Sequence, residues 1–499
     1  ALVWCNQKGE EKVITFGEMK ELSLKMCNVI SSYGVKKGDF VMSMLNRRWE
    51  YWVLVVACCK MGVVLIPATH MLTPKDVAYR VNEAGVKLLF ATEEEDVAEH
   101  ISLALPDCKN LKGVLSVNGA HFDNLDEKLE NAPAEFSFDA RPNPRDLMLV
   151  YFTSGTTGMP KMVMHDFLYP LGHVFTAKYW QDVVDDGLHF TMAETGWAKC
   201  SWGKIYGQWI SGTAVFAYDY HGRFTPTDVL PLVKKYGITT FCAPPTIYRF
   251  LVKEDLSSFD LSSIKHCSTA GESLNPEVFK QFEKATGLKI YEGFGQTEGT
   301  VMLGTFKYLS PVTGSLGKPS PLYDVRLIDD DENEVKPGEE GEIAILKSEN
   351  QCGLVAGYFK DEARTAALKN DVYFHTGDLA YQDKDGWFWY VGRKDDIIKS
   401  SGYRIGPFEV ESALMEHPAV LECAITAVPD DLRGQIVKAT IVLTKNYQPS
   451  DALIKELQNH VKKVTAPYKY PRIVEFVKEL PKTTSGKIRR VEIRENDKK

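Results

Sequence analysis

Helix-forming and strand-forming segments alternate along this chain up to about residue 305. Helix-then-strand pairs are predicted at 15–34 with 40–45, at 76–84 with 87–91, and at 227–236 with 239–242. In the first pair, Thr15 and Glu18 have the spacing of a capping box, and Gly34 stands where a helix would end. Because strands separated by helices usually pair in parallel, this alternation predicts an α/β fold.

The pattern changes twice towards the C-terminus. Short apolar runs bounded by Gly, Pro and Asp follow from about residue 305, at 325–328, 341–346 and 387–391. From 395, a charged, Gly-containing stretch precedes helix, strand, strand, helix and strand patterns that end near 477. We therefore predict a large N-terminal domain, 1–394, with parallel α/β subdomains and a small β-rich subdomain, and a small α+β C-terminal domain, 395–499.

Composition excludes several functional classes. The chain has 59 Lys and Arg against 67 Asp and Glu, a net charge of −8, so no basic surplus favours nucleic acid. None of its 10 cysteines forms a Cys-x-x-Cys pair, which disfavours structural zinc and secreted disulfides and favours a reducing compartment. The apolar run 51–59 is shorter than the ~20 residues of a membrane span. Because the chain begins at Ala1, we expect a processed N-terminus, and a cytoplasmic protein or, if a transit peptide was removed, one of the mitochondrial matrix.

A loop rich in hydroxyls and glycines follows the strand-like run 147–152. Its donors, glycines and terminal cation are Thr153, Ser154, Gly155, Thr156, Thr157, Gly158 and Lys161. Glycines let several backbone N–H groups turn towards one anion, while the hydroxyls and the ammonium add donors and charge. The loop is therefore predicted to bind phosphate, although its spacing is not that of a Walker A motif. A flexible surface loop is the alternative reading.

Four further motifs carry groups suited to a nucleotide, although each is weak alone. They are 292–298 (an aromatic, a hydroxyl and a carboxylate), 375–378 (a final carboxylate), 392–404 (a cation, then Ser and Gly) and 481–489 (a basic loop with Gly). In this order, and over nearly the whole chain, the five motifs resemble the adenylate-forming superfamily of acyl-CoA synthetases, luciferases and nonribosomal-peptide adenylation domains. Within it, 293–298 and 466–471 look most like medium-chain acyl-CoA synthetases.

The resemblance implies a site for ATP and Mg²⁺. The 153–161 loop would hold the β- and γ-phosphates, Thr297 would contact the α-phosphate, and Glu298 would bind Mg²⁺. Lys487 would bridge the substrate carboxylate and the α-phosphate, so Lys487, Thr297 and Glu298 are the expected catalytic residues. Gly271, Glu272 and Phe294 would frame the adenine, and Asp378 and Arg393 would hold the ribose. The other expected ATP-binding residues are Glu292, Gly293, Gly295 and Gln296. Many members have tyrosine where this chain has Phe294, which keeps the stacking ring but lacks the hydroxyl.

The resemblance also implies sites for coenzyme A and the acyl group. CoA contacts are expected at Ser401, Gly402, Tyr403, Arg404 and Arg433, and more weakly at Lys462 and Tyr470. Trp197, Lys199, Trp202, Cys242 and Gly295 are expected to line the acyl pocket, with burial in the core as the alternative for the tryptophans. A lysine there would disfavour long plain alkyl chains, and Gly295 would leave open a space that Trp fills in acetate-specific relatives. The hinge position falls on Asp395, so the small domain is expected to be mobile.

A carboxylic acid has a pKa of ~4 and is already an anionic nucleophile at pH 7, so the chemistry implied requires cations and Mg²⁺ but no general base. We expect an ATP-dependent acyl-CoA synthetase for a short, medium or branched aliphatic acid, forming acyl-AMP and then acyl-CoA. The alternatives are an aryl-CoA ligase, an adenylating enzyme that loads a carrier protein, a silent nucleotide-binding regulator and a P-loop kinase or ATPase. The histidine spacing fits no metal site, and acidic residues interrupt the basic run 482–494, which disfavours nucleic acid. A homo-oligomer stays open.

Overall fold

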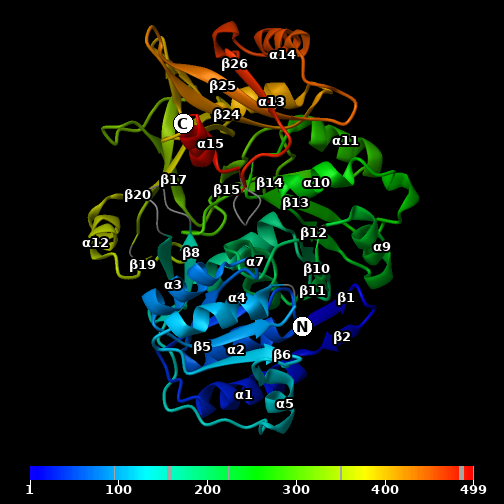
Figure 1. The fold of residues 1–499 in the computed structure, drawn as a ribbon, viewed down its shortest axis with the longest axis vertical. Coiled ribbons are helices and arrows are strands. Elements are labelled where there is room, and N and C mark those ends of the chain that lie inside the picture. The colour runs from blue at the N-terminus through cyan, green and yellow to red at the C-terminus, as the bar shows by residue number, and fades with distance from the viewer. Residues whose placement is uncertain are drawn as a thin grey trace.

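The computed structural model describes residues 1–94, 96–153, 160–222, 224–272, 274–348, 351–482 and 488–497. The described residues form a large N-terminal domain with three sheets and a small C-terminal domain with one. Figure 1 shows the small domain, in orange and red, above the large one. The predicted fold class, a large α/β domain followed by a small α+β domain, is confirmed.

The first sheet of the large domain has eight strands. In spatial order they are β19 (Gly357–Tyr358), β9 (Lys161–Asp166), β8 (Leu147–Thr153), β4 (Val64–Pro67), β3 (Phe40–Met44), β5 (Val86–Thr92), β6 (Gly113–Val117) and β7 (Asp123–Asn124). The helices of this part are α1 (Phe16–Ser32), α2 (Glu50–Met61), α3 (Pro74–Ala84), α4 (Val97–Ala104) and α5 (Leu125–Asn131). Strands β8 to β7 pair in parallel, whereas β9 is antiparallel to β8 and β19. The capping box of Thr15 and Glu18 begins α1 as predicted.

The second sheet has nine strands. In spatial order they are β16 (Lys318–Pro319), β15 (Leu303–Gly304), β14 (Ile290–Phe294), β13 (His266–Ala270), β12 (Thr240–Cys242), β10 (Leu188–Thr191), β11 (Ala214–Asp219), β1 (Leu2–Asn6) and β2 (Glu11–Ile14). Its helices are α6 (Tyr169–Phe175) with a π-helical turn (Thr176–Trp180), α7 (Ala198–Gly203), α8 (Tyr206–Ile210), α9 (Pro226–Tyr236), α10 (Pro245–Leu251) and α11 (Pro276–Thr286). Strands β14 to β1 are parallel. Strands β1 and β2 were not predicted; they have no helix between them and form an antiparallel edge.

The remaining strands form two smaller sheets. The third sheet is antiparallel and contains β17 (Asp324–Ile328), β18 (Glu340–Leu346), β20 (Tyr373–Gln382) and β21 (Phe388–Arg393), with α12 (Glu362–Asn370) beside it. The small domain contains β22 (Ile398–Ser400), β23 (Tyr403–Ile405), α13 (Pro407–Met415), β24 (Val420–Asp430), β25 (Gly434–Leu443), α14 (Asp451–Val464), β26 (Ile473–Val477) and α15 (Arg490–Asn496). The short strands β22 and β23 lie in the stretch that looked only charged and glycine-containing.

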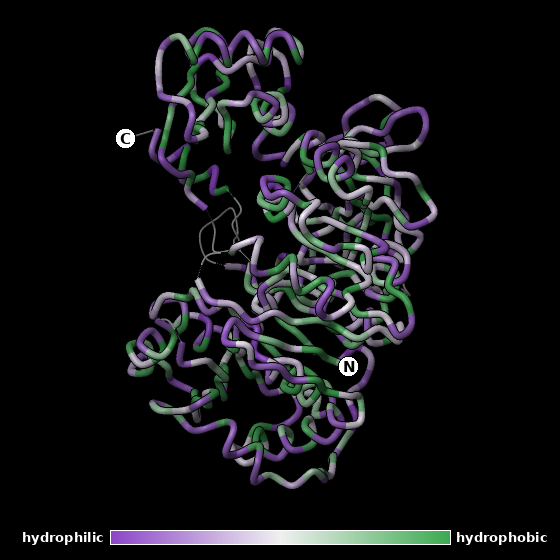
Figure 2. The backbone as a smooth tube through the Cα atoms, turned by 90° about the vertical axis from the view of Figure 1, so that its right-hand side faces the viewer, coloured by the Kyte–Doolittle hydropathy of each residue, from purple (hydrophilic) through white to green (hydrophobic). Residues whose placement is uncertain are grey.

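The two largest sheets share one buried cluster and each has a further one, whereas the small domain has its own core. Trp52 of α2 is fully buried, and its indole N–H donates to the Lys204 carbonyl beside α7 at 2.7 Å. A separate cluster, which includes Val410, Leu414 and Leu457, packs between α13, α14 and the sheet of the small domain. Figure 2 shows the apolar segments inside each domain. Among the described residues, no helix has the length and apolar character needed to cross a bilayer.

Candidate active site

The predicted nucleotide residues lie where parallel strands end. Thr153 is the last residue of β8, Gly271 follows β13, and Phe294 is the last residue of β14. Ligands of open α/β sheets bind at the carboxyl ends of the strands, so this is the expected side. Thr153 pairs with Lys161 across the β8–β9 hairpin, so the two ends of the predicted phosphate loop are adjacent. The loop residues between them, Ser154, Gly155, Thr156, Thr157 and Gly158, lie outside the described residues.

Lys161 and Glu298 stand in a cluster of charges. Burial lowers the pKa of Lys161, the neighbouring Arg364 and Arg393 lower it further, and the carboxylate of Glu298 raises it. The Glu298 side chain also hydrogen-bonds with Tyr358 of β19. Mg²⁺ that binds together with a nucleotide usually takes one or two carboxylates plus phosphate oxygens, and Glu298 beside these cations fits that donor set. The described residues contain no cluster of three His, Cys, Asp or Glu that could hold a metal by itself.

Hydrogen bonds from three directions hold the segment that carries Thr297 and Glu298. The imidazole Nε2 of His165 lies 2.7 Å from the Thr297 carbonyl oxygen. The backbone N–H of Val355 donates to the Glu298 carbonyl at 2.7 Å. The Gln296 amide donates to the Thr376 carbonyl at 2.7 Å and to the carboxylate of Asp378. Because each bond goes to a different element, the backbone of this segment is fixed before any ligand arrives.

Asp378, one of the two residues predicted to hold the ribose, is almost fully buried. It is 4% exposed on β20 and lies opposite Arg393 of β21 in the strand register. Its oxygens accept from the Tyr390 hydroxyl at 2.9 Å and from Arg393 at 3.1 Å, in addition to Gln296. The nearby Asp378 carboxylate and burial raise the pKa of Tyr390, which keeps this hydroxyl a donor. The sequence prediction paired Asp378 with Arg393, and the structure places them in contact.

The residues predicted near adenine have different surroundings. Gly271 has φ +103°, a value that L side chains rarely adopt, and so forms the turn after β13. Glu272 accepts from Thr246 at 3.3 Å and pairs with Arg249 at 3.5 Å. Phe294 lies 6.5 Å from Tyr390, measured between ring centroids.

Glu292 and Gly293 serve the packing of β14. The Glu292 carboxyl is buried, accepts from the Leu274 N–H at 3.0 Å, and has its pKa raised to about 8 by desolvation. A Cβ on Gly293 would lie 2.5 Å from the Trp180 indole. Both residues therefore have a structural reason for their identity beside the predicted nucleotide contact.

Trp202 occupies the place that Gly295 was expected to leave open. A Cβ built on Gly295 would lie 2.4 Å from the Trp202 ring and 2.5 Å from the Thr300 carbonyl oxygen. The expectation of free space beside Gly295 is therefore wrong, because an indole from α7 already fills it. Trp202 is 5% exposed and packs with Cys242, so the structure brings these three predicted pocket residues together.

The other two predicted pocket residues lie at the N-terminal end of α7. Trp197 is the residue before the helix and is half-buried. The Lys199 ammonium donates to the Ala270 carbonyl at the end of β13. Lys199 Nζ would also stand 3.7 Å from a Cβ on Gly271, so its charge lies beside the turn predicted near adenine.

The predicted CoA residues lie on the small domain and are more exposed. Arg433 donates to the Ser401 hydroxyl at 3.2 Å, next to Gly402 at φ +82°. Tyr403 is 52% exposed and stacks on Tyr468 at 4.1 Å. The contacts of the remaining predicted residues are Lys462 Nζ at 4.0 Å from the Tyr470 ring centroid and Arg404 Nε at 3.9 Å from Glu340 of the large domain.

The residues on either side of Asp395 form ion pairs with different domains. Lys394 pairs with Asp330 and Glu342 of the large domain, at 2.8 and 3.1 Å. Asp396 instead pairs with Arg494 of α15 in the small domain, at 2.5 Å. Asp395 lies between them, with an oxygen 3.6 Å from Arg393 Nε.

Lys487 lies outside the described residues, and the described residues on both sides of it are anchored. Lys482 and Ile488 form an isolated antiparallel bridge. Lys482 pairs with Glu422 at 2.7 Å, and Arg490 pairs with Glu411 at 2.7 Å.

Sequence reasoning missed three residues of this site: His165, Tyr358 and Arg364. His165 lies on β9 and reaches the site through its bond to Thr297, and the pairing of β9 with β19 places Tyr358 opposite Val163. Arg364 then lies with its guanidinium carbon 5.3 Å from the Tyr358 ring centroid. No spacing in the sequence signals a strand pair between residues about 200 positions apart.

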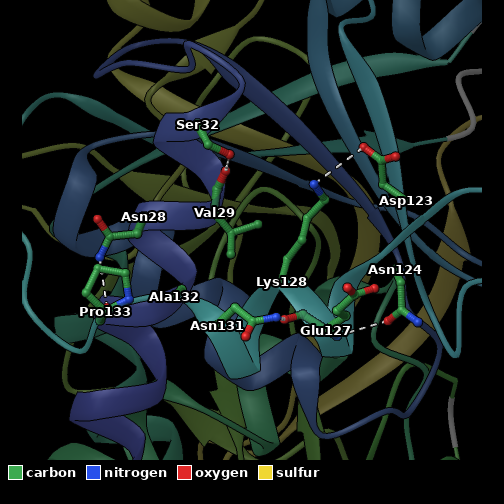
Figure 3. A pocket seen from close by; sticks show the side chains of 10 residues that line it. All are labelled: Asn28, Val29, Ser32, Asp123, Asn124, Glu127, Lys128, Asn131, Ala132 and Pro133. Carbon is green, nitrogen blue, oxygen red and sulfur yellow. Dashed lines mark hydrogen bonds and ion pairs between the residues drawn. The ribbon is translucent and has the colours of Figure 1, made fainter.

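A pocket of about 450 Å³ lies elsewhere, between α1 and α5. Figure 3 shows that its polar side chains bond to their own surroundings: Asn28 donates to the Pro133 carbonyl at 2.9 Å, and Asn124 accepts from the Glu127 N–H at 3.0 Å. Its position, at the end of the large domain away from β14 and β20 (Figure 1), separates it from the predicted nucleotide residues.

Comparison with known proteins shows the family of the chain. Residues 1–359 match the family model "AMP-binding enzyme", and residues 409–487 match "AMP-binding enzyme C-terminal domain". The mouse protein "Acyl-coenzyme A synthetase ACSM3, mitochondrial" is 43% identical over 506 residues, which cover 100% of this chain and 86% of the relative. Human "Acyl-coenzyme A synthetase ACSM5, mitochondrial" is 42% identical over 505 residues, with the same coverage.

Solved structures are similar over nearly the whole chain. The anthranilate CoA ligase AuaEII, crystallised with anthranoyl-AMP, superposes with a TM-score of 0.90 at 27% identity, covering 99% of this chain and 94% of the other. The acyl-CoA synthetase of Brucella canis superposes with a TM-score of 0.75 at 30% identity, covering 100% and 91%. On these matches, the chain belongs to the AMP-binding enzyme family.

Proposed function

We propose that this chain is an ATP-dependent acyl-CoA synthetase. It joins a carboxylic acid to ATP, giving acyl-AMP and pyrophosphate, and then transfers the acyl group to CoA with release of AMP. The carrying observation is the charge cluster around Lys161, formed by Arg364, Arg393 and Glu298, in which Arg393 also pairs with the buried Asp378. The relatives named acyl-coenzyme A synthetases, 42–43% identical over the full chain, support the same assignment.

The cluster matches the difficulty of the first step. A carboxylate must approach an anionic triphosphate, so the barrier is mainly electrostatic, and aimed cations lower it. Mg²⁺ held by Glu298 and the nucleotide would neutralise part of that charge. Thr297 would contact the α-phosphate, and Lys487 would bridge the two reacting anions. The 153–161 loop would hold the β- and γ-phosphates.

The nucleoside would bind between the large-domain strands. Asp378 and Arg393 would hold the ribose, and Gly271, Glu272 and Phe294 would frame the adenine. Glu292, Gly293, Gly295 and Gln296 would support this surface. The burial of Glu292, its bond from the Leu274 N–H and the bond from Gln296 to the Thr376 carbonyl support that role.

For the acid, we propose a short, medium or branched aliphatic chain. Trp197, Lys199, Trp202, Cys242 and Gly295 would surround it, with the Trp202 indole beside Gly295 limiting the depth of the pocket. An aryl-CoA ligase is the second candidate, because a structural relative at TM-score 0.90 is an anthranilate CoA ligase. We favour the aliphatic assignment because the acyl-CoA synthetases are the more similar sequences, at 42–43% against 27% identity.

For the second step, we propose that residues 395–499 rotate about Asp395 relative to 1–394. Lys394 is tied to the large domain and Asp396 to the small one, which supports a pivot between them. Rotation would replace Lys487 at the site with the CoA residues Ser401, Gly402, Tyr403, Arg404 and Arg433, aided by Lys462 and Tyr470. Of the two compartments expected, the mitochondrial names of the relatives favour the mitochondrial matrix.

The test is a product assay over a panel of linear, branched and aromatic acids, with ATP, Mg²⁺ and CoA. We expect AMP, pyrophosphate and acyl-CoA in equal amounts with aliphatic acids. ADP as product would overturn the proposal in favour of a kinase or ATPase. Acid-dependent pyrophosphate release without consumption of CoA would indicate an enzyme that loads a carrier protein.

A further inference from the structure

His165 is a buried histidine of β9 that touches the candidate site only through its side chain. It is 0% exposed and lies four residues after Lys161 on the same strand, so both side chains are on the same face. Its ring stacks on Tyr169 at 3.8 Å with an interplanar angle of 24°. Tyr151 of β8 meets the ring edge-on at 6.2 Å. The imidazole is therefore held in one orientation by aromatic packing.

The hydrogen bond of His165 fixes which nitrogen carries the proton. Nε2 lies 2.7 Å from the carbonyl oxygen of Thr297, and a carbonyl can only accept. Nε2 must therefore be the N–H donor. Nδ1 has no partner among the described residues and is fully enclosed, so no second bond competes for the ring.

This bond joins two parts of the site that come from different sheets. β9 carries Lys161, and the strand that pairs with it, β19, carries Tyr358, which hydrogen-bonds with Glu298. Val355, just before β19, donates to the carbonyl of Glu298. His165 and Val355 thus hold the carbonyls of the two consecutive residues Thr297 and Glu298 against the same pair of strands.

We propose that His165 is a positioning residue for adenylation: its Nε2–H holds the Thr297–Glu298 segment at a set distance from Lys161. The inference rests on the proposed function, in which Thr297 and Glu298 face the α-phosphate and Mg²⁺. Its consequence is selective. Adenylation needs the triphosphate, Mg²⁺ and Lys161 aligned, whereas acyl transfer from acyl-AMP to CoA uses no β- or γ-phosphate.

The test compares three variants of the full chain. His165→Phe keeps a ring that can stack on Tyr169 and removes the donor, and His165→Gln restores an N–H donor. His173→Phe is the matched control, because His173 is also 0% exposed, meets Tyr169 edge-on at 4.5 Å, and has no partner for either ring nitrogen among the described residues. Each variant is assayed for acyl-AMP formation, for acyl-CoA formation from supplied acyl-AMP, and for the rise in Tm on adding Mg²⁺–ATP.

We expect His165→Phe to slow acyl-AMP formation by about 10- to 100-fold, the effect of leaving one enclosed carbonyl without its donor in a catalytic segment. The Tm rise with Mg²⁺–ATP should shrink, and acyl transfer from supplied acyl-AMP should stay within about threefold. His165→Gln should recover most of the loss, and His173→Phe should show neither selective effect.

Equal losses in both steps for the two Phe variants would overturn the proposal, because His165 would then serve only the core. Wild-type rates in His165→Phe would overturn it as well. If His165→Phe does not fold, His165→Gln decides: near-wild-type adenylation supports a donor role, and a loss spread over both steps contradicts it. Failure of the wild-type chain to form acyl-AMP from any acid would instead contradict the proposed function.

Discussion

The predicted nucleotide residues and the predicted CoA residues differ in burial and in the number of hydrogen bonds that they form within the protein. Asp378 is 4% exposed and accepts three side-chain hydrogen bonds from the large domain. Tyr403 is 52% exposed, and Arg433 bonds to one neighbouring hydroxyl of its own domain. A buried, fully bonded group is set in place before its ligand binds, whereas an exposed group gains its partners when another surface arrives. The contrast teaches that one half of the proposed reaction is built within a domain and the other half between domains.

The two sides of Asp395 repeat this contrast over three residues. Lys394 donates its backbone N–H to the Gly377 carbonyl of the large domain at 2.8 Å, and its ammonium pairs there as well. Asp396 pairs with Arg494 and Arg490 of α15, so it belongs with the small domain. A rotation at Asp395 would leave both sets of ion pairs intact. The boundary between the domain with the buried nucleotide residues and the domain with the exposed CoA residues therefore falls at the proposed pivot.

The largest effect that would sharpen the comparison is expected from Lys487→Ala. An aimed charge at a reacting anion contributes ~3–4 kcal/mol, so acyl-AMP formation should fall by about 10²- to 10³-fold. Acyl transfer from supplied acyl-AMP should fall much less, because Lys487 would have left the site by then. Rapid-quench measurement of each step checks this. Equal losses in both steps would break the assignment of Lys487 to the first step alone.

Asp378→Asn should weaken both steps, since the ribose is present in ATP and in acyl-AMP. The substitution puts an amide where Arg393 and Gln296 now donate, and losing bonds to a charged acceptor costs about 1.5–3 kcal/mol. We expect kcat/KM for ATP to fall by roughly 10- to 150-fold. Asp383→Asn, in the turn after β20, is the control for an acidic residue outside the site. A loss confined to one step would contradict the shared ribose role.

Much of the site could be predicted because its groups are contiguous. The segments 153–161 and 292–298 each follow one strand, so their chemistry and their spacing could be read together. Gly295 was misjudged because its reason lies in Trp202, an indole that α7 contributes from 93 positions earlier. Tyr358 and Arg364 were missed because the pairing of β9 with β19 brings them to the site, and His165 because its partner, Thr297, is 132 positions away. Tertiary pairing and close packing leave no periodic signal in the sequence.

Asp395→Pro should block the domain rotation that separates acyl-AMP formation from acyl transfer. Proline fixes φ near −65° and also restricts Lys394 before it, so the backbone cannot rotate at the pivot. We expect CoA-dependent turnover to fall by about tenfold or more, while acyl-AMP formation stays within about threefold. Asp395→Ala is the matched control, because it removes the carboxylate near Arg393 and leaves φ free. Full turnover in the Pro variant would place the pivot elsewhere.

The smallest effect is expected from Arg433→Ala, a change among the exposed CoA residues. Among the described residues, the Arg433 side chain bonds to the exposed Ser401 hydroxyl, so its removal leaves no buried group without a partner. An exposed cation facing a phosphate contributes ~0.2–1 kcal/mol, and KM for CoA should rise by at most about fivefold. KM for ATP and the rate of acyl-AMP formation should not change, because Arg433 lies on the small domain, in the turn between β24 and β25, whereas Asp378 and Lys161 belong to the large one. Salt should mask the effect, since screening weakens exposed charges: the KM difference between wild type and variant should shrink between low and high ionic strength. A large, salt-independent rise in KM would show instead that Arg433 becomes buried against CoA, and that rotation closes this half of the site as tightly as Asp378 closes the other.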